Sequence, residues 1–364
     1  MTACDNPLLT ITDFVDYAAV RPEHVTPAVT TLAEDVEKTL LQVLDASRPA
    51  TWENVVEPLN ESLGRLTRTW GVVGHLQSVC DTPELRDAYN RELPCVSELL
   101  LRISLDTRLY ERYKALRASD EFATLSPVRQ RILERDLRDF RLSGADLPDD
   151  KRARVQEIGE RLSLLSQKFS ENLLDATNAF TLDIEREEDL DGVPEDVKAL
   201  YRATAEAAGK TGWRVTLQFP SYLPFMQFAK NRSLREKLYH AFSVRASELD
   251  GGQWDNGPLM KEILALRDEE AKLLGFANYA ESSLAVKMAS TPKEVTDFLR
   301  DLARHAKPFA VKDMEALREH AKTLGLETME SWDQAYVSES LRKSRYSYSS
   351  DVVKRYFTES TVFA

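Results

Sequence analysis

The sequence predicts a mostly α-helical protein built from many helices, with one minor β element near residues 213–219. Apolar residues recur at spacings of three and four over most of the chain, which is the period of a helix with one buried face. Only the minor element alternates strictly between apolar and polar residues, as a strand does. With 43% hydrophobic and 30% charged residues, the 364-residue chain has the composition of a globular protein.

The first helix is expected to begin at Thr26 and Pro27, as an N-cap followed by a proline at the first helical position. Its apolar positions are Val29, Leu32, Val36, Leu40 and Val43. In the second helix, Pro58 marks a late start or a kink. The apolar positions there are Val56, Leu59, Leu63, Leu66 and Trp70. Both stripes predict helices that bury one face.

Two further helices are expected in the next part of the chain. Ser126 and Pro127 open one of them, and Gly144 is its predicted C-terminal stop. Asp149 and Asp150 lead into the longest regular pattern, which is suited to packing against an antiparallel partner helix. That pattern consists of Val155, Ile158, Leu162, Leu165, Phe169, Leu173 and Ala176.

The spacing of the apolar residues then changes from that of a helix to that of a strand. The acidic stretch 185–191 is expected to be a loop, and a short helix should run from Pro194 to Gly209. The alternating residues that follow predict a strand that Pro220 closes: Trp213, Val215, Leu217 and Phe219. A single strand is unstable alone, because its backbone groups need a neighbour. Its partner strands are therefore expected to be missing or far away in sequence.

Helices are expected again in the last third of the chain. Capping boxes are predicted at Ser233–Glu236 and Thr291–Glu294. A helix between them should open at Gly257 and stop near Gly275. The long helix after the second box contains Pro308, where a kink is expected.

Charge and cysteine usage argue against several classes of function. The net charge of −12 argues against a nucleic-acid or membrane partner, because both need a basic face. The one basic and aromatic run, Arg342–Tyr348, is too short to change this. Three cysteines without a Cys-x-x-Cys pair favour a reducing compartment. With no secretory signal and no long apolar stretch, a cytoplasmic location is predicted.

A search for catalytic motifs finds no phosphate-binding loop, no nucleophile elbow and no His-Glu-x-x-His. Asp301 and His305 could contact one cation, but two ligands do not make a zinc site. All five histidines are expected to have structural roles: His24, His75, His240, His305 and His320. We therefore predict no catalytic and no metal-binding residue in this chain, and the substrate-binding residues are left unknown.

Segments in order along nearly the whole chain nevertheless resemble a single family. They are Asn6–Leu9, Arg21–Val25, Thr51–Val55, Leu137–Gly144, Phe169–Thr177, Phe219–Pro224, Leu274–Ala280 and Trp332–Tyr336. Together they resemble the N-terminal half of the oligopeptidase A branch of the M3, or thimet-oligopeptidase-like, zinc metallopeptidases. The resemblance implies a two-lobed helical scaffold and a cytosolic endopeptidase that hydrolyses short peptides.

In that family, zinc is held by a His-Glu-x-x-His helix and a downstream glutamate, none of which has a matching position here. Residues 1–211 would form the N-terminal helical domain, and residues 212–364 the beginning of the catalytic domain, truncated before the zinc motif. The resemblance implies short peptides and the missing C-terminal catalytic half as partners. We therefore expect the 364-residue chain to be inactive alone. The alternative is a non-catalytic helical module that binds peptides or a partner.

Overall fold

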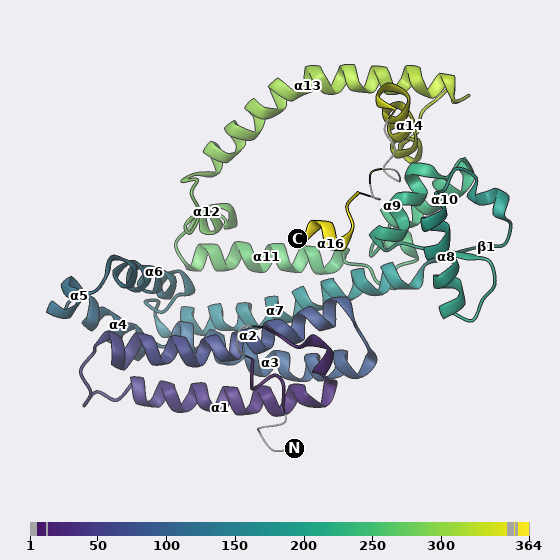
Figure 1. Ribbon diagram of the computed structural model, residues 1–364. Coiled ribbons are helices and arrows are strands. Elements are labelled where there is room, and N and C mark those ends of the chain that lie inside the picture. Colours follow the sequence, from purple (N-terminus) through teal and green to yellow (C-terminus); the bar gives the residue numbers. More distant parts are fainter. Residues whose placement is uncertain (1–5, 12–13, 348–352, 354–355, 364) are drawn as a thin grey trace. The chain divides into compact units, whose positions relative to one another are not determined.

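The computed structural model describes residues 6–11, 14–347, 353 and 356–363 (Figure 1). Cys4 and Tyr348, on which parts of the sequence argument depend, lie outside these ranges. The described chain is mostly helical, as predicted, and it divides into two compact units. Unit 1 comprises residues 1–167 and 261–288, and unit 2 comprises residues 168–260 and 289–364.

In its described residues, unit 1 contains helices and loops and no strand. Its helices are α1 (Val25–Val43), α2 (Glu57–Val79), α3 (Pro83–Leu105), α4 (Thr107–Arg117), α5 (Asp120–Thr124), α6 (Pro127–Ser143), the first part of α7 (Asp149–Ala179), most of α11 (Gly257–Leu273) and α12 (Tyr279–Leu284). Short helical turns at Tyr17–Ala19, Pro22–His24 and Trp52–Val56 precede α1 and α2. The predicted apolar stripes of α1 and α2 are largely buried, so the period correctly identified the inward faces.

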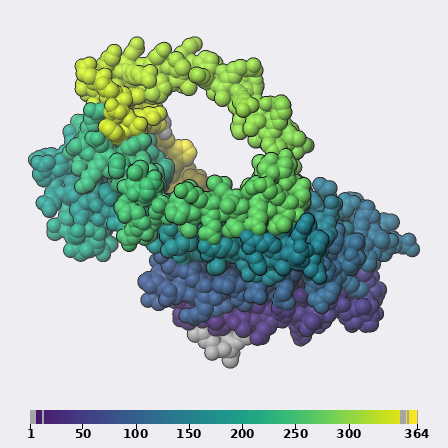
Figure 2. All heavy atoms as spheres, turned by 180° about the vertical axis from the view of Figure 1, so that it is seen from behind, coloured from purple at the N-terminus to yellow at the C-terminus, as the bar shows by residue number. Residues whose placement is uncertain are grey.

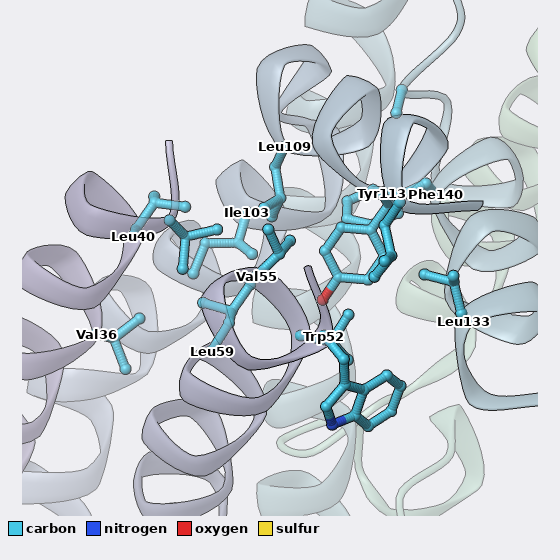
Figure 3. Close-up of a cluster of buried hydrophobic side chains, with 14 of the residues drawn as sticks. Val36, Leu40, Trp52, Val55, Leu59, Ile103, Leu109, Tyr113, Leu133 and Phe140 are labelled. Atoms are coloured by element: carbon cyan, nitrogen blue, oxygen red, sulfur yellow. The ribbon is translucent and has the colours of Figure 1, made fainter. Parts of the chain in front are cut away.

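The main core of unit 1 lies where α1, α2, α3, α4 and α6 meet (Figure 3). Tyr113 packs edge-on against Phe140, with 5.1 Å between the ring centres. Leu59 and Ile103 belong to the same cluster and are almost fully buried. Burial of each such side chain stabilises the fold by about 1.5–3 kcal/mol. Several residues of this cluster, including Leu59 and Ile103, also line a cavity.

Two predicted helix boundaries in unit 1 have different outcomes. The Ser126 hydroxyl accepts a hydrogen bond from the Arg129 amide, and Gly144 adopts a left-handed conformation with φ of 96°, so both ends of α6 are confirmed. Thr26 is not the N-cap of α1. The helix begins at Val25, two residues before the predicted first helical position Pro27 and directly after the turn Pro22–His24. The Thr26 hydroxyl instead donates to Glu92 on α3, at 2.7 Å.

Unit 2 contains the second part of α7 and the only two strands of the described chain. Its elements are β1 (Thr181–Ile184), a turn at Glu187–Leu190, α8 (Glu195–Ala207), β2 (Trp213–Thr216), α9 (Phe219–Phe228), α10 (Arg232–Ser243), a turn at Glu248–Asp250, the start of α11, α13 (Pro292–Thr323), a turn at Ser331–Asp333, α14 (Gln334–Tyr346) and α16 (Glu359–Val362).

The expectation that the strand near residue 213 lacks a nearby partner is wrong. Strand β2 pairs antiparallel with β1, with Trp213 opposite Ile184, and only α8 and its loops separate them. Gly212 has φ of +82°, and a side chain there would meet the Ile184 carbonyl oxygen at 2.4 Å. The strand also ends earlier than predicted. Pro220 lies in the first turn of α9, where its fixed φ suits a helix start.

The two predicted capping boxes are only partly correct. Asn231, not Ser233, caps α10, because its side-chain oxygen accepts from the Leu234 amide at 3.2 Å. Thr291 does cap α13 by accepting from the Glu294 amide, at 3.1 Å. The Glu294 carboxylate accepts from the Ser290 amide instead of completing the reciprocal bond. Helix α13 continues through Pro308, and its ribbon curves along its length (Figure 1).

The predicted domain division between residues 211 and 212 stays a prediction. The compact units do not divide the chain at this point. Residues 261–288 belong to the unit of the N-terminal helices, and residues 168–260 belong to the other unit. Helices α7 and α11 each contribute to both units. Each unit therefore contains segments that are distant in sequence.

Candidate functional site

Three of the five histidines lie on different elements, and the other two, His305 and His320, share α13. His24 is buried, and its Nδ1 accepts a hydrogen bond from the Arg21 amide at 3.0 Å. His75 is exposed. His240 is also exposed. On α13, His305 Nδ1 lies 2.9 Å from the Asp301 carbonyl oxygen and 3.4 Å from its carboxylate. His320 Nε2 lies 2.9 Å from the Ser340 hydroxyl.

No metal centre is formed by the part of the chain that the structure describes. Within it, no group of three or more histidine, cysteine, aspartate or glutamate side chains is arranged to hold an ion. Asp301 and His305 remain a pair, as the sequence indicated, and a zinc site needs at least three protein ligands. The described residues therefore do not form a zinc site.

No described helix combines the length and the apolar composition needed to span a bilayer.

Helix α13 presents an exposed apolar surface over most of its length. Phe298, Leu302 and Phe309 are 62%, 50% and 69% exposed, and their spacings of four and seven place them on one face. In the space-filling view, the N-terminal part of α13 forms an arm that is one helix thick (Figure 2). Only its C-terminal part packs on α14, where Ala321 is buried. A surface of this kind is typical of a protein-interaction site.

In unit 2, a buried cluster of ion pairs connects α10 with Asp333, the residue that directly precedes α14. The Asp333 side chain is fully buried and binds Arg235 and Arg232, both at 2.7 Å. Arg235 is 1% exposed and also donates to the Ala229 carbonyl. Burial alone would raise the pKa of Asp333, but hydrogen bonds from Arg232, the Glu330 amide and Arg235 lower it. The carboxylate therefore stays ionised and paired.

An open groove of about 350 Å³ lies beside this cluster. It is lined by Tyr222, Leu223, Met226, Tyr239, Ser331, Gln334, Ala335 and Ser338, from α9, α10 and the start of α14. Tyr222 stacks on Phe242 with 4.0 Å between ring centres, and burial raises the pKa of its phenol. Because the lining is uncharged and includes two tyrosines, a leucine and a methionine, the groove suits an apolar or aromatic side chain rather than an ion.

A second hollow, in unit 1, has a volume of about 210 Å³. It is lined by Leu59, Asn60, Leu63, Leu100, Ile103, Ser104, Leu109, Tyr113, Asp136, Asp139, Phe140 and Ser143, from α2, α3, α4 and α6. Burial, assisted by the charge of Asp139, raises the pKa of Asp136 from 3.8 to about 6. We call this hollow the Asp136 cavity.

Sequence reasoning found none of these sites. Asp333 and Asp136 are two of 60 acidic residues, and neither belongs to a motif that indicates burial. The only available signal for Asp333 was its place within Trp332–Tyr336, one of the segments that carried the family resemblance. For Asp136, the sequence offered only a weak signal, namely its position at helical spacing between Leu133 and Phe140, both of which are buried on α6.

Comparison with known families adds the class of protein. Residues 225–364 match Peptidase family M3. Residues 29–152 match the family described as Neurolysin/Thimet oligopeptidase, N-terminal domain. The two matches lie in the order expected of a peptidase of this type, with the N-terminal domain first. The chain thus matches two M3-type family models in succession.

Similarity to individual proteins extends over almost the whole chain. Oligopeptidase A of Salmonella typhimurium is 44% identical over 97% of this chain and 52% of its own length. In Arabidopsis thaliana, a probable cytosolic oligopeptidase A is 40% identical over 98% of this chain and 52% of its own length. The organellar, chloroplastic/mitochondrial form is 39% identical over 98% of this chain and 46% of its own length.

The chain belongs to peptidase family M3 and is similar to oligopeptidase A. It spans about half the length of the curated relatives that it matches. The resemblance read from the sequence is thereby confirmed. The activity, substrates and partners of the whole relatives are proposals for this chain.

Proposed function

We propose that this chain is the N-terminal part of an oligopeptidase A-like zinc metalloendopeptidase that hydrolyses short peptides in the cytosol. The observation that carries the proposal is the 44% identity to an oligopeptidase A over 97% of the chain. Identity at this level spans both units, so it concerns the whole scaffold and not one shared motif. The cytosolic location is part of the proposal, because the plant relatives include both cytosolic and organellar proteins.

Within this proposal, the 364 residues alone do not cleave peptides. The sequence contains no His-Glu-x-x-His, and the described residues contain no group of side chains that could hold zinc. When bound in an M3 peptidase, zinc supplies polarisation of the peptide carbonyl and activation of water. We assign that chemistry to a C-terminal segment with the zinc ligands, which is also the proposed partner of this chain.

The role left to this chain is that of a scaffold. The apolar face of α13, with Phe298, Leu302 and Phe309, is the surface we propose for contact with the C-terminal segment. Burial of such side chains would stabilise the assembly by about 25 cal/mol for each Å² removed from water. In the same unit, the buried Arg235–Asp333 pair joins α10 to the residue that directly precedes α14.

A complementation experiment tests the proposal. The chain is assayed with a quenched fluorescent short peptide, alone and fused to the C-terminal half of the Salmonella oligopeptidase A. We expect no turnover by the chain alone and chelator-sensitive turnover by the fusion. A fusion with glutamine in place of the zinc-motif glutamate is the matched control. Chelator-sensitive cleavage by the chain alone would show that the proposal is wrong.

The alternative function is a non-catalytic module that binds peptides or a partner. The observation in its favour is the aromatic groove of unit 2, with Tyr222, Met226 and Tyr239. Titration of the chain with an aromatic tripeptide, followed by its tryptophan fluorescence, separates the two functions. Saturable binding that a Met226→Arg variant abolishes, together with an inactive fusion, would favour the module.

A further inference from the structure

The Asp136 cavity has the features of a binding site that the proposed peptidase function does not use. Four helices contribute to its walls, and Leu59, Ile103, Tyr113 and Phe140 from these helices lie together in the core (Figure 3). Part of the wall therefore belongs to the buried hydrophobic core of unit 1. A cavity in such a place keeps its shape without a ligand, which reduces the entropic cost of binding.

One carboxylate in this cavity lacks the partners that burial normally demands. The Asp136 Oδ2 atom is buried and accepts no hydrogen bond. No ion pair to Asp136 is formed within the part of the chain that the structure describes. An ionised carboxylate without partners is unfavourable, and Asp136 lines the cavity, so a ligand there that brings a donor to its carboxylate binds favourably.

The surrounding groups leave the negative charge uncompensated. From α2 and α3, the lining side chains are uncharged, and Leu63 and Leu100 are apolar. On α4, Tyr113 is 2% exposed and neutral, and burial raises the pKa of its phenol. On α6, Asp139 adds a second negative charge, which is shared with the neighbouring Arg138. The cavity thus combines apolar walls with one unpaired acidic group.

We propose that the Asp136 cavity binds a small organic cation, namely a primary ammonium group on a short apolar body. The ammonium donates hydrogen bonds to the Asp136 carboxylate, and the apolar body packs against Leu63, Leu100 and Phe140. An ammonium–carboxylate bond is about twice as strong as a bond between neutral groups, and the aromatic walls add attraction for a cation. The proposal does not depend on the peptidase function.

The test compares three probes of similar shape and different charge: phenethylamine, 2-phenylethanol and 3-phenylpropionate. Binding to the full 364-residue chain is measured at pH 7.5 by ligand-observed NMR titration. We expect phenethylamine to bind at least about tenfold more tightly than the alcohol, and the carboxylate not to bind, because a charge-assisted hydrogen bond is stronger than a neutral one. Equal binding of amine and alcohol would overturn the proposal.

Two variants locate the site. Asp136→Asn removes the charge with little change of shape, and Ser143→Leu fills the cavity while leaving the carboxylate intact. Both are expected to weaken phenethylamine binding at least about tenfold. Glu134→Gln is the matched control, because Glu134 lies on the same helix, is exposed and pairs with Arg117 outside the cavity. Wild-type affinity in Asp136→Asn, or an equal loss in Glu134→Gln, would overturn the proposal.

A pH series adds a second readout. The titratable groups that line the cavity beside Asp136 are Tyr113 and Asp139. Since the pKa of Asp136 is raised to about 6, protonation at pH 5 should weaken phenethylamine binding about tenfold relative to pH 7.5. The Asp136→Asn variant should show no such change. A pH-independent affinity in the wild-type chain would contradict the assigned contact.

Discussion

Two partly or fully buried carboxylates, Asp136 in unit 1 and Asp333 in unit 2, have opposite electrostatic environments. Asp333 is completely buried, and its pKa is lowered. Asp136 is less buried, yet its pKa is raised to about 6. Burial favours the neutral form of both. The difference arises because Arg232 and Arg235 surround one carboxylate, whereas the other faces an open cavity.

The comparison shows that partners, not depth, decide what a buried carboxylate does. With its two arginines, Asp333 joins α10 to the start of α14 and has no capacity left for a ligand. Asp136 contributes nothing comparable to the fold, and its carboxylate remains available. Structural and binding roles can therefore be distinguished by the hydrogen-bond partners of the group.

The largest effect is expected from Asp333→Asn. This substitution leaves Arg235 buried without a counter-charge, and removal of one partner from a buried pair costs about 3–5 kcal/mol. Urea unfolding followed by circular dichroism measures the loss. Asp183→Asn is the control, because Asp183 pairs with Arg214 and Lys210 at the surface, where solvent screening leaves less than about 1 kcal/mol. Equal losses in the two variants would contradict the comparison.

The two arginines at Asp333 should not be equivalent. Arg235 is 1% exposed and also satisfies the carbonyl oxygens of Ala229 and Lys230, whereas the Arg232 side chain is 42% exposed. We expect Arg235→Met to cost about 2–4 kcal/mol and Arg232→Met about 1 kcal/mol in the same urea experiment. A larger loss in Arg232→Met would show that burial does not control the strength of these pairs.

A smaller effect of opposite sign is expected from Asp136→Asn. Because the folded-state pKa of about 6 lies above the ordinary aspartate value of 3.8, stability is lost as the pH rises from about 4 to 6. The two-unit shift would correspond to about 3 kcal/mol, which solvent in the open cavity reduces to about 1 kcal/mol. The variant should therefore be more stable than the wild type at pH 7.5 and equal to it at pH 4. Destabilisation at pH 7.5 would mean that Asp136 has a partner.

The smallest effect concerns Asp183. Hydrogen bonds from Arg214 and Lys210 lower its pKa to about 2. A lowered pKa contributes stability above the unfolded value, and this contribution is lost as the pH falls from about 4 to 2. The small difference between the wild type and Asp183→Asn should therefore disappear in acid and in concentrated salt. Persistence at high salt would show that the contact is not an exposed ion pair.

The helices could be predicted from the sequence because their signals are local. Apolar spacing gave the buried faces of α1 and α2, and Ser126 and Gly144 gave the ends of α6. The failures arose where distant contacts decide. Strand β1 is four residues long and directly follows the long helix α7, so its sequence showed no separate pattern. At α10, a capping-box sequence was present, but Asn231 lies two residues earlier and serves as the cap.

The family could be predicted from ordered segments, but the two carboxylate sites could not. Asp136 and Asp333 obtain their properties from side chains on other helices, and a single sequence does not show these neighbours. The prediction that the chain contains no catalytic or metal-binding residue also stays a prediction. It concerns the whole sequence, whereas the structure describes most of it.

The most direct test of the central account is the zinc content of the purified 364-residue chain. The chain is loaded with zinc, dialysed and analysed by atomic emission, and the same sample is assayed for cleavage of a short peptide. A scaffold part of an M3 peptidase without the zinc ligands should retain no stoichiometric zinc and cleave nothing. One tightly bound zinc per chain, with cleavage that a chelator abolishes, would contradict the account.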